Sequence, residues 1–239
     1  MMAIPVLIMG ESGTGKSTSL RRLPCDLSAV VSVQGKRLPF REPLDVVTCS
    51  SIPDMIKPDG TTEAGIQTLA LRANRPIVVL DDFGYTITDL YMRLTYGPEK
   101  LRDQYEPYKI IGSQVYGLIN AIQRDGGGVN AEKIVYMVMH TDINAQGHVV
   151  PATVGKMLNE KINLVGMFTI CLLSCTDGEN YRFITNGKPP AKSPDGMFSD
   201  TEVPNDLKAV DDAIREYWGM APLAAPQGMV VSEPVYEVG

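Results

Sequence analysis

The sequence is poor in the residues from which metal centres and membrane spans are built. Its 239 residues include two histidines and one tryptophan, and no run reaches the roughly 18 apolar residues that can span a bilayer. The apolar start, residues 4–9, is too short for a span and lacks a charged leader. We therefore expect a cytoplasmic protein that makes no contact with a membrane.

The four cysteines do not indicate a zinc site. Cys171 and Cys175 are four residues apart, but neither histidine is near them in the sequence and the four-ligand spacing of a zinc site is missing. In a reducing compartment such residues are most simply small buried hydrophobic side chains. We expect this of Cys25 and Cys49 as well.

Negative charge is concentrated at the end of the chain. The net charge is −6, but from Ser193 onward nine acidic residues face two basic ones, so the first 192 residues carry about +1. The overall charge therefore neither supports nor excludes binding to nucleic acid. The acidic segment has two interpretations: it regulates access of nucleic acid to a basic loop, or it is a solvated helix over residues 206–218 with a flexible end.

Short β-rich runs alternate with helical patterns along the chain. This alternation predicts an α/β fold with a mostly parallel central sheet, helices on its faces and late antiparallel strands. The expected strands are residues 4–9, 29–33, 45–49, 77–80, 134–139, 167–174 and 181–185. Four helical segments are expected. The first begins near Lys16, and the others cover residues 62–73, 85–123 with a break at Gly97-Pro98, and 206–218. Thr61 or Thr62 is expected to cap the helix over residues 62–73.

Turn and loop signals define the domain organisation. "DGGG" at residues 125–128 predicts a turn, residues 144–150 predict a polar loop, and "APLAAPQG" begins a segment of low complexity. We expect one domain over residues 1–220 and a flexible tail over residues 221–239. Trp218 is interpreted as an anchor that packs the end of the last helix onto the core.

The segment "GESGTGKS", residues 10–17, fits the pattern G-x-x-x-x-G-K-[ST] between a predicted strand and a predicted helix. The glycines let backbone N–H groups turn towards phosphates, and the start of the helix favours negative charge. Lys16 is expected to reach the β and γ phosphates of a nucleotide, and the Ser17 hydroxyl to bind Mg²⁺. The expected phosphate-binding residues are Gly10, Glu11, Ser12, Gly13, Thr14, Gly15, Lys16, Ser17 and Thr18.

Acidic and imidazole side chains follow two further apolar strands. "IVVLDD" places Asp81 where a second Mg²⁺ ligand is needed, and Asp82 next to it as a group that polarises the attacking water. His140 follows "IVYMVM", where it is expected either to sense the γ-phosphate or to serve as a structural histidine. The sequence thus predicts a nucleoside triphosphatase that uses Mg²⁺.

The order of these motifs resembles the RecA core, over residues 3 to 218. It runs from the phosphate loop through "DVVTCSSIPD", "TTEAGIQTLALRAN" and "IVVLDD" to "YMVMHTD". "VPATVGKM" and "YRFITNGKPPAKSPDGMF" resemble the phage-encoded RecA-like ATPases associated with single-strand annealing. The resemblance implies ATP-modulated binding of single-stranded DNA in recombination, annealing or replication, by a homo-oligomer or filament. It also implies an annealing or single-strand-binding partner, and the host cytoplasm as location.

The resemblance also assigns roles to residues outside the phosphate loop. Lys188, or as a second choice Lys192, stands where RecA-like proteins carry a lysine that reaches a neighbour's γ-phosphate. Gln34 stands near the place of the family's catalytic glutamate, and because glutamine cannot take a proton, turnover is expected to be slow or to use Asp82. The implied DNA-binding residues, in the loop 144–156, are Asn144, Gln146, Gly147, His148 and Lys156.

Two other functions share the phosphate loop and stay open. A nucleotide or small-molecule kinase would need an arginine-rich lid, whereas Arg93, Arg102 and Arg124 are scattered. A non-catalytic module in which ATP only stabilises an assembly is kept open by Gln34. Adenine is preferred over guanine through the resemblance, because no N-K-x-D guanine-binding motif is present.

Overall fold

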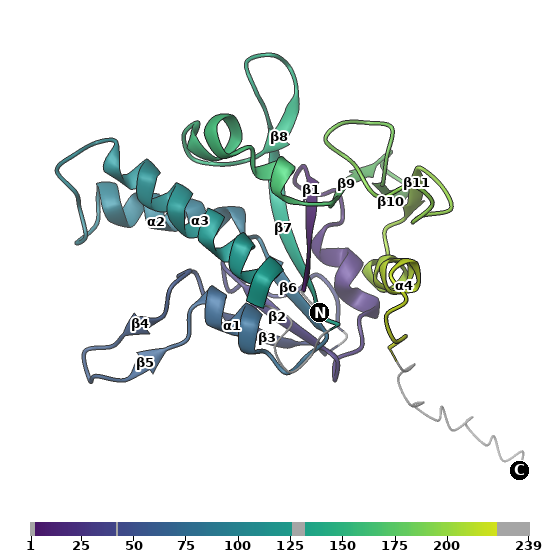
Figure 1. The fold of residues 1–239 in the computed structure, drawn as a ribbon, viewed down its shortest axis with the longest axis horizontal. Coiled ribbons are helices and arrows are strands. Elements are labelled where there is room, and N and C mark those ends of the chain that lie inside the picture. The colour runs from purple at the N-terminus through teal and green to yellow at the C-terminus, as the bar shows by residue number, and fades with distance from the viewer. Residues whose placement is uncertain (1–2, 42, 126–131, 224–239) are drawn as a thin grey trace, which may run out of the picture.

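A nine-stranded sheet organises the fold in the computed structural model, which describes residues 3–41, 43–125 and 132–223 (Figure 1). Its strands follow the order β11-β10-β9-β1-β7-β6-β2-β3, with β8 paired to β7. The six strands from β9 to β3 are mutually parallel, whereas β10, β11 and β8 pair antiparallel. The strands are β1 (Ile4–Gly10), β2 (Ser28–Ser32), β3 (Asp45–Thr48), β6 (Ile77–Asp81), β7 (Ile134–Ile143), β8 (Val149–Pro151), β9 (Ile170–Thr176), β10 (Tyr181–Ile184) and β11 (Glu202–Pro204).

Helices cover both faces of this sheet, which is why its central strands are continuously apolar. All five residues of β6 are buried, as expected for a strand without a solvent face. One face packs against α1 (Ile66–Arg72), α2 (Gly84–Thr95) and α3 (Glu106–Asp125), and the other against the 3-10 helix η1 (Ser17–Arg22) and α4 (Leu207–Tyr217). The predicted α/β class, the mostly parallel sheet and the late antiparallel strands are confirmed.

The parallel register brings the ends of several strands to one edge of the sheet. Gly10, the last residue of β1, is opposite His140 on β7. Asp81, the last residue of β6, is opposite Ser32 at the end of β2. In sheets of this kind ligands bind outside the carboxyl ends of the strands.

The helix predicted over residues 62–73 begins later than expected. Thr62–Glu63 forms a short strand, β5, which pairs antiparallel with β4 (Met55–Ile56). The N-cap of α1 is Gly65, in an extended conformation, and its N–H donates to the Asp54 carboxylate at 2.8 Å. The prediction of a Thr61 or Thr62 cap was wrong, because the side chain of Asp54 and a hairpin take up this segment.

The segment after His140 is a β-hairpin rather than a strand end followed by a loop. Strand β7 continues to Ile143 and pairs with β8. Asn144 closes the turn, since its side-chain oxygen accepts from the N–H groups of Gln146 and His148 at 3.0 and 2.9 Å, and Gly147 has a φ of 79°. The hairpin projects from the body of the protein (Figure 1).

The remaining predictions had mixed outcomes. Trp218 is 39% exposed and stacks edge-on against Tyr217, so it is not the expected core anchor; it follows the last turn of α4, past the face formed by Leu207 and Ile214. Cys171 is buried as expected, but Cys25 is exposed. Residues 126–128 of the predicted turn and residues 224–239 of the predicted tail lie outside the described residues. No helix in the described ranges is long and apolar enough to cross a membrane.

Candidate nucleotide-binding site

The phosphate loop connects β1 to η1 and depends on its glycines. Gly13 and Gly15 have φ values of 82° and 86°, which L side chains rarely adopt. A Cβ at Gly15 would also lie 2.8 Å from the ring of Tyr181, and one at Gly10 would lie 2.7 Å from the carbonyl oxygen of Ser174. The loop therefore packs against β9 and β10 so closely that only glycine fits at these points.

Lys16 is the most buried charged side chain of the loop, with 6% of its surface exposed. Its ammonium group donates to the carbonyls of Gly10 at 2.9 Å and Glu11 at 2.6 Å, and lies 3.4 Å from Nδ1 of His140. Burial lowers the pKa of Lys16, while the nearby carboxylates of Asp82 and Asp81 oppose that shift. Lys16 is thus largely shielded from water but still lines the cleft, where its ammonium group can bind an anion.

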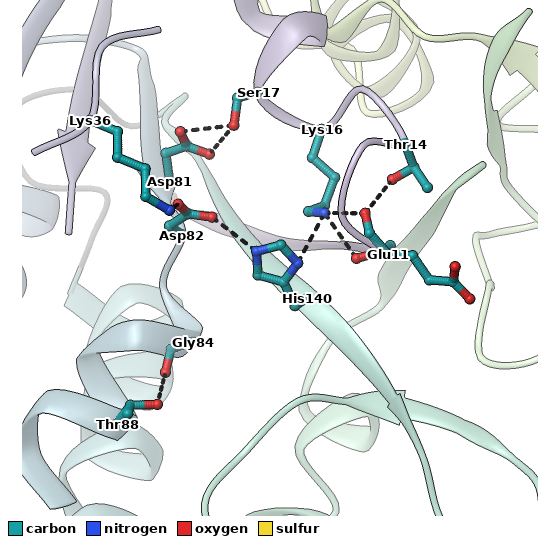
Figure 2. Close-up of polar contacts among 11 residues, drawn as sticks. Glu11, Thr14, Lys16, Ser17, Lys36, Asp81, Asp82, Gly84, Thr88 and His140 are labelled. Atoms are coloured by element: carbon teal, nitrogen blue, oxygen red, sulfur yellow. Dashed lines mark hydrogen bonds and ion pairs between the residues drawn. The ribbon is translucent and has the colours of Figure 1, made fainter. Parts of the chain in front are cut away.

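Ser17 and Asp81 form the second part of the site. The Ser17 hydroxyl lies 3.1 and 3.0 Å from the two carboxylate oxygens of Asp81 and donates to them (Figure 2). Burial, and next the charge of Asp82, raises the pKa of Asp81 to about 6. A hydroxyl and a carboxylate are hard oxygen donors of the kind that Mg²⁺ prefers. These two residues therefore fit a Mg²⁺ ion held next to the phosphate loop.

Asp82 and His140 lie side by side between the two parts. Asp82 has a φ of 59°, and this turn directs its carboxylate towards His140, whose Nε2 is 3.4 Å away. Because an ammonium group can only donate, Nδ1 of His140 accepts from Lys16, which leaves the ring proton on Nε2 facing Asp82. Burial and the charge of Lys16 lower the pKa of His140. The neutral imidazole thus connects Lys16 to Asp82.

Lys36 and Tyr85 belong to the site but were not among the predicted residues. The ammonium of Lys36 lies 3.2 Å from the carboxylate of Asp82 and 4.9 Å from the centre of the Tyr85 ring. Tyr85 also meets His140 edge-on, with ring centres 5.9 Å apart. Lys36 follows a strand and a glycine in "VSVQGK", as site residues often do. The sequence does not show that β2 is the neighbour of β6, so it does not indicate that Lys36 lies next to Asp82.

These elements surround a cleft of about 620 Å³ at the carboxyl edge of the sheet. Nine of the predicted site residues line it: Ser12, Gly13, Gly15, Lys16, Ser17, Thr18, Asp81, Asp82 and His140. The other lining residues are Lys36, Arg37, Leu38, Pro39, Tyr85 and Tyr181. The geometry brings together the glycine-rich loop with Lys16, the Ser17–Asp81 pair and the His140–Asp82 pair.

The other predicted site residues lie outside this cleft. Gln34 and Lys188 are exposed, and among the described residues neither contributes to the lining. Gln146, Gly147 and His148 are exposed at the tip of the β7–β8 hairpin, with Asn144 partly buried beside them. Lys156 is 80% exposed in its side chain and lies 3.5 Å from Glu160. Their predicted roles in catalysis and in DNA binding stay predictions.

Comparison with known proteins adds little to these observations. No protein-family model matches the sequence, and no curated protein matches it. Among solved structures the chain is similar to the P4 protein from bacteriophage phi6 in complex with ADP, at 16% identity and a TM-score of 0.36. The match covers 77% of this chain and 55% of that one. A likeness at this level assigns no function.

We expect Asp81→Asn to be more stable than the wild type at pH 7.5 by about 1–3 kcal/mol, in buffer without nucleotide or divalent metal. Folding raises the pKa of Asp81 from 3.8 to about 6, so folding favours its acid form. The corresponding stability is present below about pH 4 and is lost as the pH rises through 6, where the buried carboxylate becomes charged. Urea unfolding at pH 5 and pH 7.5 measures the difference, which should be larger at pH 7.5.

Asp195→Asn is the matched control, because Asp195 is exposed and the change in charge and shape is the same. This control should leave the free energy of unfolding within about 0.5 kcal/mol of the wild type. If Asp81→Asn were less stable than the wild type at both pH values, the hydrogen bonds from Ser17 would outweigh the cost of burying the carboxylate.

Proposed function

We propose that this protein binds and hydrolyses ATP with Mg²⁺, and that it does so in work on single-stranded DNA. The observation that carries the proposal is the cleft itself, where Lys16, the Ser17–Asp81 pair and the His140–Asp82 pair converge. Phosphoryl transfer needs a cation for the phosphates, oxygen ligands for the metal and a carboxylate for water, and these side chains can supply all three. When bound, Mg²⁺ would neutralise charge that develops on the phosphate oxygens.

The residues of the chain divide the work in hydrolysis. Lys16 turns its ammonium from the carbonyls of Gly10 and Glu11 towards the β and γ phosphates. Asp82 orients the attacking water, because its carboxylate is 15% exposed and faces the cleft. His140 holds Asp82 through its Nε2 proton and meets Lys16 through Nδ1, so the loss of the γ-phosphate changes both contacts.

Single-stranded DNA is assigned to the β7–β8 hairpin. The hairpin extends from the strand that carries His140, and the N–H of Ala152 donates to the His140 carbonyl at 2.8 Å. This bond joins His140 to the base of the hairpin, whose exposed turn carries Gln146, Gly147 and His148. We assign Lys188 to the cleft of a neighbouring subunit in a homo-oligomer, because it is exposed and lies outside its own cleft.

Phosphate release from Mg-ATP, measured with and without single-stranded DNA, tests the proposal. We expect release that DNA stimulates and that EDTA abolishes, while Lys16→Met, purified in the same way, reports any contaminating ATPase. Release without stimulation would remove the DNA assignment. Bound ATP without release would favour an assembly module, and release that requires an added hydroxyl acceptor would favour a kinase.

A further inference from the structure

Lys36 is placed opposite the two aspartates by the pairing of β2 with β6. The register sets Ser32 beside Asp81, so the loop that follows β2 runs along the mouth of the cleft. Gly35 has a φ of 61°, and a Cβ there would lie 3.2 Å from the side chain of Thr48. This turn brings the next residue, Lys36, to the carboxylate of Asp82.

The two contacts of Lys36 hold it in the lining of the cleft without burying it. Its side chain is 59% exposed, whereas that of Asp82 is 15% exposed. The ion pair at 3.2 Å and the Tyr85 ring at 4.9 Å orient the ammonium, but an ion pair this exposed to water is weak. An anion with more negative charge than a carboxylate can therefore enter the cleft and replace Asp82 as the partner of Lys36.

The cleft has an ammonium group at each end of the His–Asp pair. Lys16 meets His140 at 3.4 Å, His140 meets Asp82 at 3.4 Å, and Asp82 meets Lys36 at 3.2 Å (Figure 2). Lysine binds phosphate as a compact point charge, so the ammonium of Lys36 offers a second contact to the phosphates of a nucleotide that Lys16 holds in the same cleft. Lys188 does not fill this place in its own subunit.

We propose that Lys36 is a phosphate-binding residue supplied by the same chain. When ATP binds, the ammonium of Lys36 separates from the Asp82 carboxylate and contacts the terminal phosphate instead. This exchange of partners has two consequences. Lys36 distinguishes ATP from ADP, since only ATP has the phosphate that reaches it. It also releases one carboxylate oxygen of Asp82, which then accepts a hydrogen bond from water. This inference rests on the proposed binding of ATP in the cleft.

Equilibrium binding of Mg-ADP and of a Mg-ATP analogue with a non-hydrolysable β–γ bridge tests the inference without any measurement of turnover. We expect Lys36→Met to weaken binding of the ATP analogue about tenfold and that of ADP less than about twofold. Lys36→Arg should recover most of the loss, because it keeps the charge. Lys57→Met is the matched control: Lys57 pairs with Glu63 at 3.4 Å and lies outside the cleft lining, so both affinities should stay unchanged.

A second variant tests the exchange itself. Asp82→Asn removes the competing carboxylate, so it should tighten binding of the ATP analogue, and this gain should be smaller in the Lys36→Met background. If Lys36→Met changed the affinities for the ATP analogue and ADP by the same factor, Lys36 would only hold Asp82 in place and the inference would be overturned. If the wild type bound neither nucleotide, the proposed function would fail, and the inference with it.

Discussion

Lys16→Met is expected to hydrolyse Mg-ATP at least about 100-fold more slowly than the wild type while keeping its fold. Lys16 is 6% exposed and its ammonium group is already held by the carbonyls of Gly10 and Glu11, so much of its desolvation precedes the arrival of a phosphate. Charge held ready in a site that excludes water is worth more than the same charge in solution. Steady-state phosphate release at saturating Mg-ATP measures the effect on kcat.

Lys133→Met provides a control that matches Lys16→Met in chemistry and burial. Lys133 is 2% exposed, and its ammonium donates to the carbonyls of Ala70 and Leu71 at 3.1 and 2.8 Å. Burial lowers the pKa of Lys133, as it does for Lys16. Lys133 lies outside the cleft lining, so its replacement should keep the wild-type rate in protein that is still folded. A Lys16→Met protein with the wild-type rate would contradict the assignment of the cleft.

The sequence was sufficient to predict the parts of the site that depend on one strand and the residues after it. The phosphate loop, Asp81 and His140 each follow an apolar run that is buried on both faces, and parallel strands bring their carboxyl ends to one edge. Strand order along that edge decides which loops meet, and no local pattern encodes it. Lys36 was therefore missed, because its contact with Asp82 arises from the pairing of β2 with β6.

Local side-chain contacts account for the other differences between sequence and structure. Residues 62–64 continue a helical pattern in the sequence but are not helical in the structure. The Asp54 carboxylate accepts from the N–H of Gly65, and Thr62–Glu63 forms strand β5. Asn144 closes a turn that lets β7 continue past His140. In both places one Asx side chain competes with the regular backbone pattern, and periodicity does not detect such competition.

Asp211→Ala is expected to lower the free energy of unfolding by about 3–5 kcal/mol. Asp211 lies on α4 and is fully buried; it accepts from the Tyr136 hydroxyl at 2.8 Å and from Nε of Arg215 at 2.6 Å. Arg215 is 2% exposed, so the variant would leave a buried guanidinium with carbonyl partners but without its carboxylate. Urea unfolding monitored by circular dichroism measures the loss.

Asp212→Ala separates burial from charge, because Asp212 is the next residue on the same helix. Its carboxylate lies 2.6 Å from the ammonium of Lys208, but its side chain is 49% exposed, so we expect a loss of no more than about 1 kcal/mol. Replacing both buried partners, in Asp211→Leu with Arg215→Met, should cost less than Asp211→Ala alone, since no unpaired charge remains inside. Equal losses in Asp211→Ala and Asp212→Ala would contradict this account, and would mean that the acidic face of α4 acts through its total charge. The expected order instead makes buried Asp211, which accepts from Tyr136 of β7 and is neutralised by Arg215 of its own helix, the residue that fixes α4 against the sheet on the face that η1 shares.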